Sequence, residues 1–109
     1  MFLNLLRNAR QALRDVPEER RTIVVRANCT DPMVRIDVCD QGVGIAEADL
    51  VRIFRGGHSL RPGGHGLGLH GCANSISALG GRLWASSDGI GHGATFHVEL
   101  QAAQAGVPA

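Results

Sequence analysis

The feature that most constrains the fold is a pair of strand-like runs, residues 22–30 and 33–40, separated by only two residues. In the second run, apolar Val34, Ile36 and Val38 alternate with more polar neighbours, the pattern of a strand with one buried face. The intervening Asp31-Pro32 is a turn signal. The two runs therefore predict a β-hairpin, and with it an antiparallel sheet.

Helical and strand-like patterns surround this hairpin. Residues 2–16 repeat apolar side chains on one face at about 100° per residue, which predicts an amphipathic helix. The pattern after the hairpin predicts a short helix at 46–54, a loop at 55–65, a helix at 67–79 and strands at 82–87 and 94–100. We therefore expect one α+β domain over residues 1–100, followed by a disordered tail at 101–109. Its architecture should be a two-layer α/β sandwich with a mixed, mostly antiparallel sheet and helices on one face.

Composition excludes several classes of protein. The chain has no lysine, and a Walker-A P-loop and a eukaryotic-type protein kinase both place a lysine on the phosphates, so both are excluded. The net charge of +1 gives no sign of nucleic-acid binding. No run approaches the ~20 apolar residues of a membrane helix. The three cysteines, Cys29, Cys39 and Cys72, form no CxxC pair and indicate a reduced, intracellular protein.

Two polar features precede and follow the hairpin. Asn4 and Asn8 are four residues apart on a predicted helix, so their amides lie on one side, where the oxygens suit Mg²⁺ or are simply solvated. Asp40-Gln41-Gly42-Val43-Gly44-Ile45 comes directly after an apolar strand. Its carboxylate can accept a hydrogen bond from an exocyclic amine, and its glycines let backbone approach a ligand. The alternative to a ligand-binding segment is an ordinary Asp/Gly turn.

A glycine-rich segment, residues 63–71, leads into the second long helix and can bind phosphate through backbone amides and the helix dipole. Within it, Gly66-Leu67-Gly68-Leu69-His70-Gly71 also fits a dinucleotide-binding pattern, with Asp88 at about the spacing of a ribose-binding acid. That interpretation lacks the preceding strand and the parallel βαβ frame that it requires.

The histidines suggest no catalytic or metal site that the sequence can establish. His65, His70 and Cys72 match no defensible zinc spacing. His92 and His97 are expected on loop and strand surfaces, and no Ser-His-Asp or paired-carboxylate arrangement can be recognised.

Five segments in this order resemble the catalytic, ATP-binding domain of bacterial two-component sensor histidine kinases, in the GHKL superfamily, over residues 4–100. They are Asn4-Leu5-Leu6-Arg7-Asn8-Ala9 (N box), Asp40-Gln41-Gly42-Val43-Gly44-Ile45 (first glycine box), Ile53-Phe54 (F box), Gly64-His65-Gly66-Leu67-Gly68-Leu69-His70 (second glycine box) and Gly93-Ala94-Thr95-Phe96 (closing strand). One such segment alone would be weak support for the resemblance. Five segments in the family's order are strong support.

The resemblance implies a role for each matched position. Asn8 would ligate the Mg²⁺ on the ATP phosphates with support from Asn4, and Asp40 would accept a hydrogen bond from the adenine amine, with Thr95 close by. Residues 55–65 would be the ATP lid, in which Arg61 contacts a phosphate. The implied ATP-binding set is Asn4, Asn8, Asp40, Gly42, Gly44, Ile45, Arg61, Gly64, His65, Gly66, Leu67, Gly68 and Thr95. No catalytic residue is assigned, because none of the five histidines resembles the family's phosphoacceptor.

The resemblance also implies a reaction and partners. In the ATP-hydrolysing relatives a glutamate that activates water takes the place of Asn4, and an amide is a poor base, so the chain favours phosphoryl transfer from ATP to a protein histidine. Its partners would be a phosphoacceptor helical hairpin and a response regulator, with no nucleic acid and no membrane segment in the chain. We expect the cytoplasmic C-terminal piece of a longer kinase, which lacks the N-terminal edge and the dimerisation hairpin. A non-catalytic nucleotide- or partner-binding module and an anti-sigma-type serine kinase are the alternatives.

Overall fold

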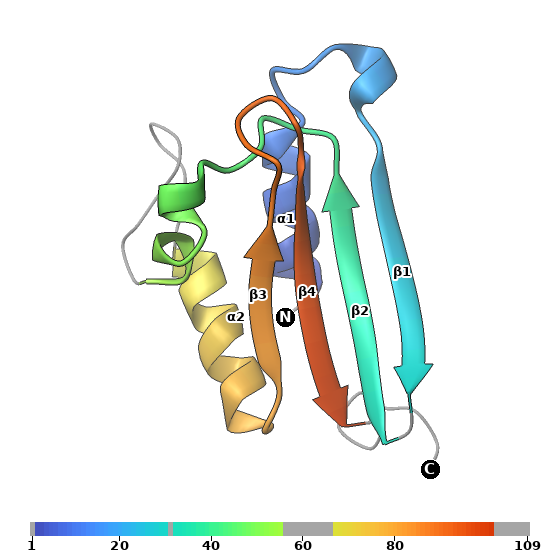
Figure 1. Ribbon diagram of the computed structural model, residues 1–109, viewed down its shortest axis with the longest axis vertical. Coiled ribbons are helices and arrows are strands. Elements are labelled where there is room, and N and C mark those ends of the chain that lie inside the picture. The colour runs from blue at the N-terminus through green and yellow to red at the C-terminus, as the bar shows by residue number, and fades with distance from the viewer. Residues whose placement is uncertain (1, 31, 56–66, 102–109) are drawn as a thin grey trace.

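The computed structural model describes residues 2–30, 32–55 and 67–101, which form an α+β sandwich of two layers (Figure 1). One layer is a four-stranded sheet and the other contains two helices, both on the same side of the sheet (Figure 1). The elements are α1 (Phe2–Ala12), β1 (Ile23–Thr30), β2 (Met33–Asp40), α2 (Leu67–Ala78), β3 (Arg82–Ser86) and β4 (Ala94–Gln101). This architecture confirms the predicted fold class.

The sheet has the strand order β1-β2-β4-β3, and every pair of neighbours is antiparallel. The predicted hairpin is confirmed, and its register pairs Ile23 with Asp40 at the open end and Thr30 with Met33 at the turn. On its other side β2 pairs with β4, so that Asp40 lies opposite Ala94. The last residue of β2 is thus held between two strands.

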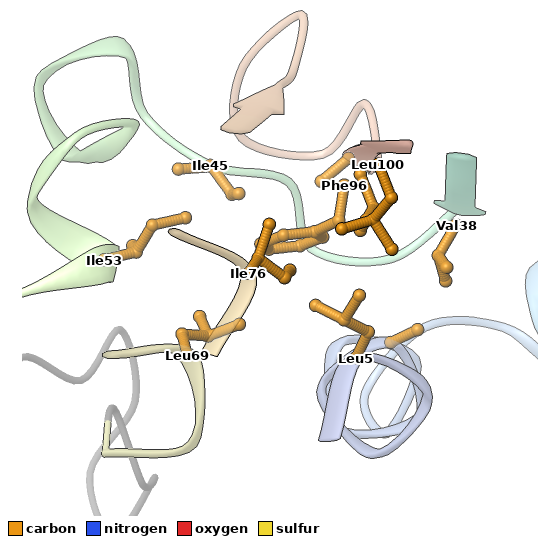
Figure 2. Packing of buried hydrophobic residues seen from close by; sticks show 11 residues of the cluster. Leu5, Val38, Ile45, Ile53, Leu69, Ile76, Phe96 and Leu100 are labelled. Atoms are coloured by element: carbon orange, nitrogen blue, oxygen red, sulfur yellow. The ribbon is translucent and has the colours of Figure 1, made fainter. Parts of the chain in front are cut away.

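The core lies between the helices and one face of the sheet (Figure 2). Because successive strand residues point to opposite faces, every second residue of β4 enters it: Ala94, Phe96, Val98 and Leu100. Leu5 from α1 and Ile76 from α2 meet these side chains (Figure 2). The packing therefore fixes which sides of α1 and α2 face the sheet.

Helix α1 is shorter than the predicted helix at 2–16. It ends at Ala12, because the carbonyl of that residue accepts a hydrogen bond of 3.0 Å from the N–H of Val43. The chain continues as a tight turn, although Leu13 and Val16 remain buried. A long-range backbone contact, which no helical periodicity can reveal, ends the helix.

The predicted helix at 46–54 is wrong in type. Two short 3-10 turns occupy it, Glu47–Asp49 and Arg52–Phe54, with i→i−3 hydrogen bonds such as Phe54 N–H to Val51 O at 3.3 Å. A segment of this length has little helical stability of its own, so tertiary packing decides its conformation. The packing here inserts Ile53 into the core.

The second helix ends as predicted at a glycine pair. Gly80 has φ +78°, and its N–H donates to Ser77 O while the N–H of Gly81 donates to Ile76 O, both at 2.9 Å. These two bonds form a Schellman motif. Among the described residues, no helix has the length and apolar character needed to cross a membrane.

The first residue of the expected tail, Gln101, is part of a strand. Gln101 belongs to β4 and pairs with Met33, whereas residues 102–109 lie outside the described part of the chain. The register of β4 with β2 explains the difference, because the strand continues until its partner ends.

Candidate functional site

A buried carboxylate lies at the end of β2. Asp40 is 3% exposed, and its Oδ1 accepts a hydrogen bond of 2.9 Å from the N–H of Gly42. Its Oδ2 is buried as well. Charged side chains are rarely buried without a polar function or a specific set of contacts. The hydrogen bond from the Gly42 N–H to Oδ1 therefore fixes the orientation of the carboxylate.

The loop that follows, residues 41–45, packs against the end of α1. A Cβ placed on Gly42 would lie 2.3 Å from the carbonyl oxygen of Ala12, so only glycine fits there. The N–H of Val43 donates to that same oxygen. The end of α1 and the loop after Asp40 are therefore in direct backbone contact.

A second loop, residues 87–93, contacts the loop at residues 41–45 on the side away from α1. Gly91 N–H donates to Val43 O at 2.7 Å, and Gly93 N–H donates to Gly42 O at 3.2 Å. Gly44 has φ +76°, and a Cβ there would lie 2.1 Å from the carbonyl oxygen of Gly89. The loop after Asp40 is thus enclosed between α1 and the loop that precedes β4.

Ser87 joins the two loops and was missed in the sequence. Its hydroxyl accepts a hydrogen bond of 3.0 Å from the N–H of Ile45 and donates to Gly93 O at 2.6 Å. Its position before Asp88-Gly89 was the available signal, because serine often stabilises turns through its hydroxyl. Ile45 is itself buried in the core.

Asn4 and Asn8 are both half-buried on one side of α1. Asn8 lies one helical turn before Ala12, the residue that contacts the loop after Asp40. The structure therefore brings the first glycine segment to the end of the helix that carries the two amides.

The second glycine segment is described only in part. Arg61, Gly64, His65 and Gly66 lie outside the described residues, as does the predicted lid apart from Arg55. Leu67 and Gly68 form the first residues of α2. The predicted helix after the glycines is therefore confirmed, and the roles assigned to these residues remain predictions.

Thr95 lies away from Asp40, which corrects the expectation that the two side chains are neighbours. Thr95 pairs with Cys39, and its Oγ1 is 3.0 Å from the Cys39 Sγ, on the sheet face opposite the helices. The residue opposite Asp40 is Ala94. A difference of one position along a strand changes the face, which explains the error.

His70 and Cys72, the candidate metal ligands considered above, have contacts within the fold. The Nδ1 of His70 lies 3.1 Å from the carbonyl oxygen of Phe54, and its Nε2 lies 3.2 Å from the Asn74 amide nitrogen. Cys72 is buried within α2. Within the described ranges, no group of three His, Cys, Asp or Glu side chains is placed to hold a metal ion.

A polar cluster covers the open face of the sheet and corrects the expectation for His97. His97 is only 8% exposed, because its ring stacks on Trp84 with centroids 5.1 Å apart. Its Nδ1 donates to the Oδ1 of Asp37 at 2.7 Å, and Ser86 Oγ lies 2.8 Å from Nε2. The sequence could not reveal this grouping, because the four residues come from three strands.

Asp37 stabilises the fold most strongly in its charged form. Burial raises the pKa of Asp37, but hydrogen bonds from His97 and Arg35 outweigh burial, and the pKa lies below its ordinary value of 3.8. A lowered carboxylate pKa contributes stability above the unfolded pKa and loses it as the pH falls through the folded pKa.

Asp37→Asn should therefore lower the free energy of unfolding by about 1 kcal/mol near neutral pH. The difference from the wild type should shrink as the pH falls below about 4. Urea denaturation between pH 3 and 7 measures both effects. Asp88→Asn, at an exposed loop position, is the charge-matched control and should behave like the wild type. An equal loss at every pH would show that the Asp37 charge is not the stabilising feature.

Comparison with known proteins identifies the family to which the chain is similar. Residues 1–104 match the family of histidine kinase-, DNA gyrase B-, and HSP90-like ATPases. The sensor protein FixL of Bradyrhizobium diazoefficiens is 34% identical over 94% of this chain and 20% of its own length. The adaptive-response sensory kinase SasA of Prochlorococcus marinus is 34% identical over 89% of this chain and 26% of its own.

A solved structure supports the same relationship. Full-length ShkA, in complex with AMPPNP, has a TM-score of 0.76 and 30% identity over 91% of this chain and 20% of its own. The chain thus spans between a fifth and about a quarter of these relatives. The antiparallel sheet of the described strands also lacks the parallel βαβ unit of a dinucleotide site.

Proposed function

The chain belongs to the family of histidine kinase-, DNA gyrase B-, and HSP90-like ATPases, and on that premise we propose that it transfers the γ-phosphoryl group of ATP to a protein histidine. The family match and the sensory kinases among its relatives identify an ATP-binding kinase domain. The acceptor, the metal and the partners are part of the proposal. In it, the domain works in the cytoplasm within a two-component phosphorelay.

Asp40 is the single observation in the structure that carries ATP as the phosphoryl donor of this proposal. Its buried carboxylate is oriented by the Gly42 N–H, and a carboxylate is the acceptor that suits the exocyclic amine of adenine. Guanine has a carbonyl at that position and would oppose the carboxylate. The geometry therefore favours ATP over GTP.

The amides of α1 fit a magnesium ion. Mg²⁺ takes oxygen ligands, and it commonly uses one or two protein groups together with substrate phosphates and water. The half-buried Asn8 would provide the ligand and Asn4 would support it. When bound, the ion neutralises charge on the phosphates. The glycine segment before α2 would hold those phosphates through backbone N–H groups.

Asn4 supports transfer over hydrolysis. Hydrolysis needs a base that activates water, and an amide is a poor base. Transfer requires an acceptor, which in this proposal is a histidine on a helical hairpin of the same or a partner chain. A response regulator would then receive the phosphoryl group.

The proposal is tested by supplying an acceptor in trans. A histidine-bearing helical hairpin of a sensor kinase is mixed with the 109-residue chain, Mg²⁺ and γ-labelled ATP. We expect an acid-labile, alkali-stable label on the hairpin, reduced by at least about tenfold in Asn8→Ala. Asn28→Ala, at an exposed position of β1, is the matched control and should transfer normally.

The other outcomes identify the alternatives. An acid-stable label on serine would indicate a serine kinase. Mg²⁺-enhanced ATP binding in calorimetry without transfer to any hairpin tested would indicate a non-catalytic nucleotide-binding module.

A further inference from the structure

Arginines surround a hollow of about 610 Å³ beside α1 and the turn that follows it. The chain runs from this turn toward β1 (Figure 1). The residues that line it are Arg7, Arg10, Gln11, Leu13, Arg14 and Arg21. Four of the six carry a guanidinium group and none carries a carboxylate. The charged groups that line the hollow are therefore all positive.

Helix geometry brings two of these arginines together, and the turn after the helix adds a third. Arg7 and Arg10 are three residues apart in α1, so their side chains lie on one side of the helix. Arg14 follows in the turn after α1 and lines the same hollow. All three are exposed, and their guanidinium groups make no ion pair or hydrogen bond within the described residues.

The fourth arginine, Arg21, is held in place by hydrogen bonds to the backbone of the turn after α1. Arg21 donates from Nε to Val16 O at 3.1 Å and from Nη2 to Arg14 O at 3.3 Å. Its neighbour Arg20 donates to Gly91 O at 2.8 Å and anchors this turn to the loop before β4. The Arg21 guanidinium is thus oriented before any ligand arrives, which lowers the entropic cost of binding.

Like charges held around one hollow repel each other, and an anion with several charges relieves that repulsion. A guanidinium has a planar fork of donors that matches phosphate oxygens. The volume lies in the range of small-molecule sites. The net charge of +1 opposes a nucleic-acid partner, whose long backbone needs a broad basic surface.

We propose that this arginine hollow binds a small, multiply charged phosphate compound at a site separate from the nucleotide site. Its lining includes neither the amides Asn4 and Asn8 nor Asp40 and the loop that follows. Because the two sets of residues do not overlap, we expect that both sites can be occupied together. Occupation of the hollow would fix the turn between α1 and β1.

The test uses inorganic tripolyphosphate and the full chain, by calorimetry with and without saturating ATP·Mg²⁺. We expect one tripolyphosphate per chain in the presence of ATP, and binding weaker by at least about tenfold in Arg10→Gln/Arg14→Gln. Both side chains are exposed, so the variant should fold, as circular dichroism can check. Arg26→Gln/Arg52→Gln removes the same charge outside the hollow and should bind within about twofold of the wild type.

Three results would overturn the proposal. Complete displacement of tripolyphosphate by ATP would assign the phosphate to the nucleotide site. Equal weakening in the control variant would indicate general attraction. Tighter binding of a hexaglutamate peptide would point to an acidic protein segment. Fructose 1,6-bisphosphate, tested in parallel, distinguishes an organic phosphate from an inorganic one as the preferred ligand.

Discussion

ATP binding by the Asp40→Asn variant is expected to be weaker than that of the wild type by about 10- to 100-fold, because a hydrogen bond to a charged acceptor is lost. The asparagine Oδ1 can still accept from the Gly42 N–H, as the carboxylate does at 2.9 Å. The amide NH₂ then replaces the buried Oδ2 and presents a donor to the adenine amine, which is also a donor. Calorimetry with ATP and GTP measures the loss, and GTP should weaken much less.

Asp37→Asn is the matched control for this experiment. Both carboxylates belong to β2, but Asp37 lies on the open face, where it binds His97, and Asp40 lies at the helix side. Asp37→Asn should reduce stability and leave ATP affinity unchanged. Asp40→Asn should instead reduce ATP affinity and leave stability unchanged. Equal ATP affinity in the wild type and Asp40→Asn would contradict the assignment of Asp40 to adenine.

The sequence predicted the parts of the site that depend on local patterns. The alternation of residues 33–40 predicted the strand, and Asp40 was correctly placed at its end, before the glycine loop. The i, i+4 spacing likewise placed Asn4 and Asn8 on one side of a helix. These features need no knowledge of distant contacts, because periodicity and spacing determine them.

Contacts between distant segments could not be predicted in this way. Ala12 O accepts from Val43, which ends α1, and Ser87 joins the two glycine-containing loops. The register of β4 decides that Ala94 and not Thr95 lies opposite Asp40. Strand register depends on the partner strand, and an error of one residue reverses the face.

His97 illustrates the same limit for burial. His97 was expected on a strand surface, and it does belong to the strand β4. Neighbouring strands then bring Trp84 and Asp37 against the ring and cover it. A sheet face without helices can therefore still bury a polar side chain, if its neighbours are large and complementary.

Gly44→Ala is expected to be strongly destabilising, by about 2–4 kcal/mol, because it combines backbone strain with a steric clash. Gly44 has φ +76°, and the new Cβ would lie 2.1 Å from the carbonyl oxygen of Gly89. The two loops would have to separate, which breaks the 2.7 Å bond from Gly91 N–H to Val43 O. Thermal denaturation should show a Tm lower by roughly 10–25 °C.

Two other glycines separate the contributions of strain and clash. Gly80 has φ +78° with open space around its Cβ position, so Gly80→Ala should cost only the strain, about 1 kcal/mol. Gly71 lies within α2 with no atom within 4 Å of its Cβ position, and Gly71→Ala should stabilise by about 0.5–1 kcal/mol. Equal effects of Gly44→Ala and Gly80→Ala would show that the loops separate at no cost. The contact between them would then not be what holds the Asp40 loop in place.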